Sequence, residues 1–243
     1  MRFPHRIQQI QTILDSYKYP EPFAQPLKNY FKANPKFGSK DRKQLRELTF
    51  AYLRTGNLFA EFDLDKALGL SLILTGKTEL FGKEEAFFNQ GIYGEIARLP
   101  TIDERLKALQ KIHPEISKED IFTFSNLVSE GFKNEEFIES HLEQPLVWIR
   151  IQQGKEKLVE ADLKQNFIYP LAEKYLGLGF AQDTKLTELQ SFQKGWFWIQ
   201  DASTQSAADY LGANENEIWW DCCAGAGGKT LCLADNVPSV KIY

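Results

Sequence analysis

The sequence DCCAGAGGKT occupies residues 221–230 and decides the fold of the C-terminal part of the chain. The apolar run IWWDC (218–222) precedes it and predicts a buried parallel strand. KTLCLAD (229–235) follows as the start of a helix, and SVKIY (239–243) predicts the next strand. Small residues between a strand and a helix let a ligand approach the backbone, and the unpaired N–H groups of the helix favour polar or anionic groups. The stretch therefore predicts a ligand-binding turn in a strand–helix–strand unit.

The glycine pattern excludes two common nucleotide motifs. A phosphate-binding loop needs glycine five positions before the Gly228-Lys229 pair, where this chain has Cys223. A dinucleotide motif needs a third glycine at the position of Thr230. From the turn alone, a tight strand–helix connection without a ligand stays open as the alternative.

Four stretches of the chain together resemble one enzyme family. CAGAGGKT (223–230) resembles the C-A-A-P-G-G-K-T cofactor motif of the Fmu/Sun-type RNA (cytosine-5-) methyltransferases. PLVWIR (145–150) is similar to the strand that opens the family's pre-catalytic module, and GWFWIQDASTQ (195–205) to the segment that leads into its catalytic domain. FGSKDRKQLRELTFAYLR (37–54) is similar to the helical, antitermination-factor-like domain of some members. All four occur in the family's order.

The resemblance has departures. Gly225 stands where the family has Ala, and Ala226 where it has Pro; both are small, so the turn should still form. Residues 202–204 read Ala-Ser-Thr instead of Glu-Ala-Ser, which leaves the role of that segment open.

The resemblance implies S-adenosyl-L-methionine as cofactor and methylation of cytosine C5 in RNA, in particular rRNA. The implied cofactor-binding residues are Cys223, Ala224, Gly225, Ala226, Gly227, Gly228 and Lys229. The family's catalytic cysteines are expected beyond residue 243, so none of the three cysteines present is assigned to catalysis. We therefore expect a truncated, Rossmann-like methyltransferase domain that is inactive alone.

Patterning divides the chain into three predicted domains of a multidomain α and α+β protein. Residues 1–143 predict an all-α, RNA-binding type of domain, with Ser39 as a helix N-cap and a capping box at Thr101 to Glu104. Residues 144–200 predict a small α+β module with strands at 146–151 and 196–200. Residues 201–243 predict the incomplete cofactor-binding domain.

Charge is distributed unevenly along the chain. The net charge is −4, yet residues 1–60 hold 11 Lys and Arg against 4 Asp and Glu. A basic block on an acidic chain is a candidate phosphate-binding face. Arg42, Lys43 and Arg46 lie off the apolar stripe of their helix, and these three with Arg150 are the predicted RNA contacts. A solvated surface, or for Arg150 a surface ion pair, is the alternative.

Several classes of protein are disfavoured. No apolar run reaches the length of a membrane span, and the first residues lack the core of a signal peptide, so we expect a cytoplasmic protein. Three cysteines near the C-terminus, without a C-x-x-C pair or nearby histidine, predict neither a disulfide framework nor a metal site; Cys232 is expected to be a buried structural thiol. Two other functions stay open: a non-catalytic RNA-binding protein, and a methyltransferase fold acting on protein or small molecules.

Overall fold

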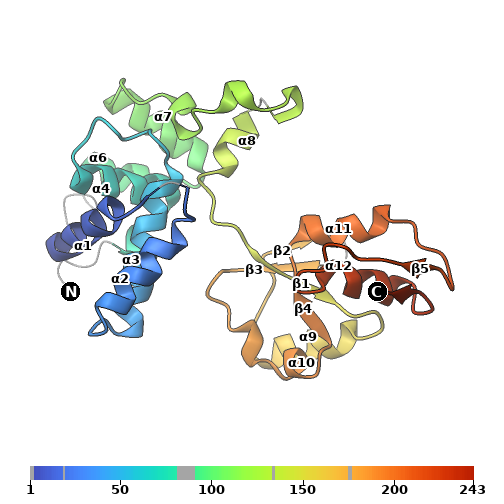
Figure 1. Ribbon diagram of the computed structural model, residues 1–243. Coiled ribbons are helices and arrows are strands. Elements are labelled where there is room, and N and C mark those ends of the chain that lie inside the picture. The colour runs from blue at the N-terminus through green and yellow to red at the C-terminus, as the bar shows by residue number, and fades with distance from the viewer. Residues whose placement is uncertain (1–2, 19, 81–90, 133–134, 175–176) are drawn as a thin grey trace. The chain divides into compact units, whose positions relative to one another are not determined.

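The chain forms two compact units, Met1–Glu143 and Gln144–Tyr243. A computed structural model describes residues 3–18, 20–80, 91–132, 135–174 and 177–243 (Figure 1). The first unit is helical throughout its described residues, whereas the second combines helices with two small sheets.

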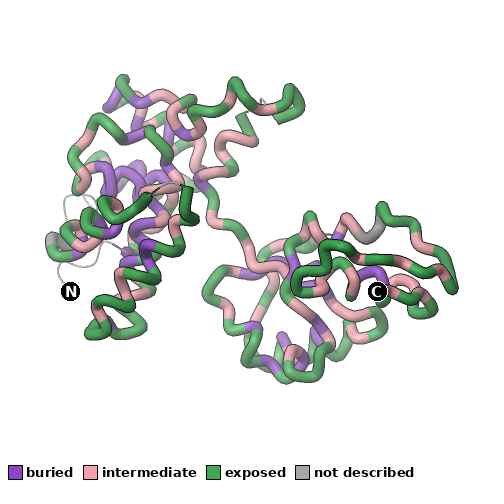
Figure 2. The backbone as a smooth tube through the Cα atoms, in the orientation of Figure 1, coloured by how far each residue is buried: buried purple, intermediate pink, exposed green. Residues whose placement is uncertain are grey.

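The helical unit is built on one fully buried helix. Helix α4 (Leu64–Thr75) has eight consecutive buried residues, 67–74, so all of its faces are covered. Figure 2 shows this buried stretch inside the unit. Helices α1 (Phe3–Asp15), α3 (Ser39–Arg54), α6 (Gly91–Ala97) and α7 (Ile102–Ile112) pack against it. The unit also contains α2 (Ala24–Ala33) and α8 (Glu135–Ser140). Short 3-10 turns lie at Thr78–Leu80, Lys118–Ile121, Ser125–Leu127 and Glu130–Phe132.

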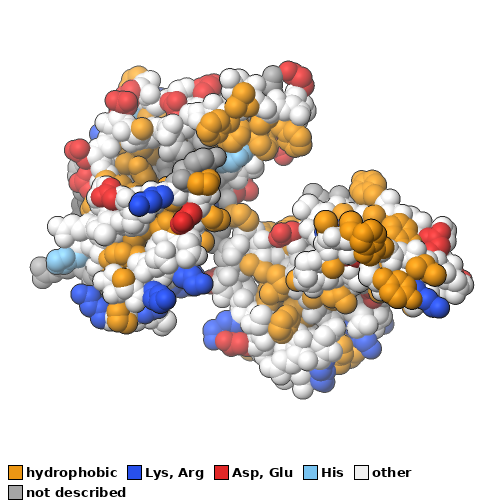
Figure 3. Space-filling model, in the orientation of Figure 1, with side chains coloured by type: hydrophobic (Ala, Val, Ile, Leu, Met, Phe, Trp, Pro, Cys, Tyr) orange, Lys and Arg blue, Asp and Glu red, His pale blue; other side chains and the backbone are white. Residues whose placement is uncertain are grey.

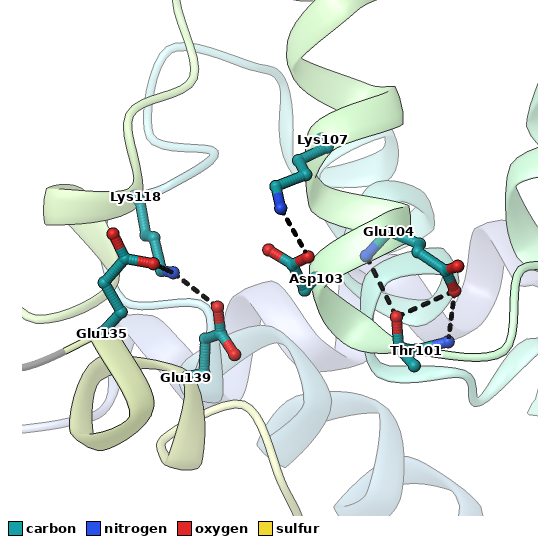
Figure 4. A network of polar contacts seen from close by, with 7 residues as sticks. All are labelled: Thr101, Asp103, Glu104, Lys107, Lys118, Glu135 and Glu139. Carbon is teal, nitrogen blue, oxygen red and sulfur yellow. Dashed lines mark hydrogen bonds and ion pairs between the residues drawn. The ribbon is translucent and has the colours of Figure 1, made fainter.

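Local polar contacts set helix boundaries in this unit. The capping box predicted at α7 is confirmed, because the Glu104 backbone N–H donates to Thr101 Oγ1 and the Thr101 backbone N–H donates to Glu104 Oε2, each at 3.2 Å (Figure 4). Lys118 joins the 3-10 turn Lys118–Ile121 to α8 through ion pairs with Glu135 and Glu139 (Figure 4). The prediction that Ser39 is an N-cap is wrong by one residue: the extended Gly38 is the N-cap of α3, with no side-chain hydrogen bond.

The second unit contains a four-stranded antiparallel sheet in the order β2-β3-β1-β4. Strands β1 (Val147–Ile151) and β4 (Phe197–Ile199) occupy the two segments that the sequence predicted. The other strands are β2 (Ala172–Lys174) and β3 (Gly177–Phe180), and the connecting helices are α9 (Glu156–Gln165) and α10 (Gln190–Gln193). Alternation along β1 places Ile149 in an apolar cluster with Val159 and Leu163 of α9.

The opposite face of this sheet is polar and is covered by later helices. Trp148 and Arg150 alternate with Ile149 along β1, and they pair with Gly179 and Gly177 of β3. These glycines leave room for larger groups: a Cβ on Gly177 would lie 2.6 Å from Gln205 Oε1. Helices α11 (Ala202–Tyr210) and α12 (Gly228–Asn236) pack here against β1 and against each other.

A two-stranded parallel sheet completes this unit. Strands β5 (Ile218–Trp219) and β6 (Lys241–Ile242) pair in parallel and are connected by α12, as predicted for a strand–helix–strand unit. The prediction of a buried strand over 218–222 is wrong, because β5 has two residues and the Ile218 and Trp220 side chains are 71% and 79% exposed. Two strands cannot cover both of their own faces.

Candidate functional site

The glycine-rich turn between β5 and α12 depends on two left-handed residues. Gly225 has φ +53° and Gly227 has φ +81°, values that favour glycine. A Cβ at either position would meet nothing within 4 Å, so space lies open beside both residues. Gly227 is the N-cap of α12 and forms no side-chain hydrogen bond, so the first turn of that helix has no protein side-chain cap.

Asp221 closes this turn. Its Oδ1 accepts a hydrogen bond from the Cys223 backbone N–H at 3.0 Å, and its Oδ2 accepts one from Thr230 Oγ1 at 2.5 Å. The Thr230 hydrogen bond, followed by the Cys223 N–H, lowers the pKa of the Asp221 carboxyl from its ordinary value. The carboxylate therefore joins the end of β5 to the start of α12 and fixes the turn between them.

A hollow of about 250 Å³ lies beside the turn. Cys222, Cys223, Lys229 and Thr230 line it on the turn side, and the rest of its wall is mainly apolar. Of the seven predicted cofactor residues, Cys223 and Lys229 border this hollow, whereas residues 224–228 form the adjacent bend. A small polar edge on an apolar wall is typical of a site for an organic ligand.

Helix α12 is held by Arg150, which the sequence had placed at the RNA surface. The Arg150 side chain is only 1% exposed, and its Nη2 donates to Asn236 Oδ1 at 2.7 Å and lies 3.6 Å from Asp235 Oδ2. Asp235 also accepts the Gln153 backbone N–H at 3.1 Å. The prediction that Arg150 contacts RNA is therefore corrected: its guanidinium is buried against the end of α12.

Two glutamines, Gln200 and Gln205, connect α11 and α12 to the four-stranded sheet. Gln200 Oε1 accepts hydrogen bonds from Trp198 Nε1 and from Cys232 Sγ of α12, both at 2.9 Å. Gln205 of α11 donates through Nε2 to the Gln200 backbone oxygen at 2.8 Å and to the Ile149 oxygen at 3.3 Å. Sequence reasoning had not assigned either residue, although both belong to the 195–205 motif; that motif was the available signal.

The three cysteines differ in exposure. Cys222 and Cys223 are exposed, whereas Cys232 is buried, as predicted for a structural thiol. Among the described residues, no group of three or more His, Cys, Asp and Glu side chains is arranged to hold a metal ion. Within the same residues, no helix is both long enough and apolar enough to cross a membrane.

The three predicted RNA contacts of the helical unit lie on α3 and differ in how exposed they are. Arg42 is half-buried, and its Nε donates to the Phe37 backbone oxygen at 2.8 Å, so it contributes to the structure of the α2–α3 connection. Lys43 is exposed and lies 3.8 Å from Glu47, and Arg46 is exposed. Arg46 and Lys43 are therefore the accessible members of the predicted set.

Further exposed cations precede Arg42, Lys43 and Arg46 in the chain and were not singled out from the sequence. Four exposed lysines lie on α2, in the loop after it and at the start of α3: Lys28, Lys32, Lys36 and Lys40. In Figure 3, Lys and Arg side chains gather over this lower part of the helical unit. The positive charge of residues 1–60 was the signal that could have identified them.

Comparisons with known proteins agree with the sequence motifs. The chain is 29% identical over 112 residues to the ribosomal RNA small subunit methyltransferase B of Vibrio cholerae, a match covering 44% of this chain and 26% of that protein. It is 26% identical over 144 residues to the Escherichia coli protein of the same name, covering 56% of this chain and 29% of the relative. The matched region thus spans between a quarter and a third of these relatives. No family model matches the chain.

A solved structure supports the fold. The crystal structure of PH0851 superposes with a TM-score of 0.53 at 16% identity, covering 99% of this chain and 62% of that one. Identity at this level bears on the fold alone. Together with the curated relatives, the findings confirm the resemblance inferred from the motifs: this chain is similar to the ribosomal RNA small subunit methyltransferase B proteins.

Proposed function

We propose that the chain binds S-adenosyl-L-methionine at the 223–229 turn and belongs to an enzyme that methylates cytosine C5 in rRNA. The observation that carries this proposal is the bend at Gly225 and Gly227, which leaves open space beside the uncapped N-terminus of α12. The similarity to small-subunit rRNA methyltransferases supports the reaction class.

The residues of the turn fit the proposed cofactor. Residues 224–228 of the turn are all alanine or glycine, and an apolar hollow adjoins the turn. Residues 223–229 would hold the cofactor, with Cys223 and Lys229 at the border of the hollow. When bound, S-adenosyl-L-methionine supplies an electrophilic methyl group. Asp221 would contribute by holding the turn in shape through Cys223 and Thr230.

We assign a separate role to each of the three segments 1–143, 144–200 and 201–243. The first would bind RNA phosphates through its exposed cations, the second would position the third, and the third would bind the cofactor. None of the three cysteines is proposed as the nucleophile that attacks cytosine, since Cys232 is buried, Cys223 belongs to the cofactor turn and Cys222 lines the hollow proposed for the cofactor.

Isothermal titration with S-adenosyl-L-methionine tests the cofactor site. The proposed site predicts binding heat that saturates at one S-adenosyl-L-methionine per chain. A site that makes all of the cofactor's contacts would bind it with a micromolar dissociation constant, about −8 kcal/mol. Gly227→Ala should abolish this signal. Gly195→Ala is the matched control, because Gly195 also has a left-handed φ, +69°, and open space at its Cβ but lies in the turn between α10 and β4. Equal binding by both variants would contradict the proposed site.

Filter binding with structured RNA tests the helical unit. Charge reversal of Lys28 and Lys32 should weaken RNA binding and reduce the slope against salt concentration by about one per lost phosphate contact. Lys111→Glu, a reversal on α7 away from these lysines in sequence, is the control. An affinity for RNA without any cofactor binding would favour the non-catalytic RNA-binding alternative. Cofactor binding without salt-sensitive RNA affinity would favour a methyltransferase of protein or small molecules.

A further inference from the structure

Polar side chains of the α+β segment fasten α12 at its middle and at its C-terminal end. At the middle, Cys232 Sγ donates to Gln200 Oε1 at 2.9 Å. At the end, Asn236 Oδ1 accepts from Arg150 Nη2 at 2.7 Å, and Asp235 lies 3.6 Å from the same nitrogen. Both anchoring residues are buried: Arg150 is 1% and Gln200 is 6% exposed.

The sheet, rather than α12, fixes the position of Gln200. Its backbone N–H donates to the Trp148 oxygen at 2.9 Å, and Trp198 Nε1 donates to its side-chain oxygen at 2.9 Å. Gln205 Nε2 donates to its backbone oxygen at 2.8 Å. The sheet and α11 therefore fix the position of Gln200, and Gln200 in turn fixes the position of α12 through Cys232.

The amide nitrogen of Gln200 lies close to the end of the cofactor turn, where α12 begins. Nε2 is buried without a hydrogen-bond partner, and it lies 3.3 Å from the position that a Cβ on Gly228 would occupy. Gly228 is the first residue of α12, directly after the Gly227 N-cap. The side chain of Gln200 therefore lies beside the residue where the proposed ligand site meets α12.

From this geometry we infer that Gln200 and Arg150 are positioning residues for the cofactor turn. Gln200 holds the middle of α12 through Cys232 and lies beside Gly228 at its start, and Arg150 holds its end, so that the N–H groups of the first turn keep their direction. This inference rests on the proposed cofactor site. It also gives a role to Gln200 of the 195–205 motif, which had none, and replaces the RNA contact that the sequence had predicted for Arg150 of the 145–150 motif.

Thiol counting tests the positioning without any ligand. Cys222 and Cys223 are exposed and should react quickly with a disulfide reagent, whereas Cys232 is 0% exposed and should react slowly. Gln200→Leu and Arg150→Met each remove buried hydrogen bonds to α12 and should accelerate the third thiol about tenfold or more. Two variants are used because they act at different places on the helix, Gln200→Leu at Cys232 and Arg150→Met at Asn236.

A control variant separates local release from general loss of stability. Ser191 is buried and donates to Asp162 Oδ2 at 2.5 Å, joining α10 to α9 on the other face of the sheet. Ser191→Ala should lower the unfolding midpoint but leave the reaction of Cys232 unchanged. Equal acceleration of the Cys232 reaction in Ser191→Ala and Gln200→Leu would overturn the inference. An unchanged Cys232 rate in both Gln200→Leu and Arg150→Met would also overturn it.

Titration of the same proteins with S-adenosyl-L-methionine completes the test. We expect about tenfold weaker binding by Gln200→Leu and Arg150→Met and unchanged binding by Ser191→Ala. If the unmodified chain does not bind while the thiol rates change as expected, the proposed cofactor site fails and the fastening of the turn stands. If all four proteins bind equally, the positioning role is wrong even though the cofactor site is correct.

Discussion

Replacing Arg150 by methionine should destabilise the second unit strongly while leaving the helical unit intact. The substitution keeps an unbranched chain in a site that is 1% exposed but removes the hydrogen bond to Asn236 and the charge beside Asp235. A hydrogen bond to a charged group contributes about 1.5–3 kcal/mol. Breaking a buried ion pair costs about 3–5 kcal/mol, chiefly through the charge left behind. Asp235 keeps the Gln153 N–H at 3.1 Å, so we expect a loss of about 2–4 kcal/mol.

Tryptophan fluorescence can measure this loss in the second unit alone. The chain has five tryptophans, at positions 148, 196, 198, 219 and 220, and all of them belong to that unit. With a urea dependence of about 2 kcal/mol per M, the fluorescence midpoint should fall by about 1–2 M. Arg150 also lies 6.0 Å from the centre of the Trp198 ring, so the native emission should change.

The double variant Arg150→Met/Asp235→Asn provides the internal check. Asn at 235 removes the unpaired charge while keeping an oxygen for the Gln153 N–H, so it should recover about 1 kcal/mol or more relative to Arg150→Met. A change of less than about 0.5 kcal/mol in Arg150→Met, the range of ordinary surface substitutions, would refute the reasoning. The absence of any recovery in the double variant would show that the charge on Asp235 is not the cause.

Three other predictions follow from single residues. Gly227→Ala should lower the free energy of unfolding by about 1–2 kcal/mol in urea titrations, since its φ is +81° and its Cβ meets no atom; an unchanged midpoint would mean that the bend relaxes. The NMR titration of Asp221 should have its midpoint below the ordinary 3.8, so the contribution of this carboxylate is present above that pH and is lost as the pH falls through the lowered pKa; Thr230→Val should move the midpoint upward. Phe167→Gly should raise the free energy of unfolding by about 0.5–1 kcal/mol, because Phe167 is 82% exposed and its backbone has φ +56°; a loss would indicate that the ring packs.

Local sequence determined the elements and the bend of the proposed site. Glycines at 225 and 227 indicated a turn between a strand and a helix, and both adopt the left-handed backbone. The capping box at Thr101 formed as predicted because its partners are three residues apart and need no distant contact. The alternation of Val147, Ile149 and Ile151 likewise produced β1 with one apolar face.

Tertiary structure alone decided what the polar residues of that strand do. Arg150 looked free to contact RNA because its sequence neighbours say nothing about Asp235 and Asn236, which reach it from 85 and 86 residues further along the chain. The same holds for Gln200, whose contact with Cys232 exists only because α12 packs on the polar face of the sheet. Periodicity shows that a residue faces one side of a strand, but burial and partners depend on which distant element covers that side.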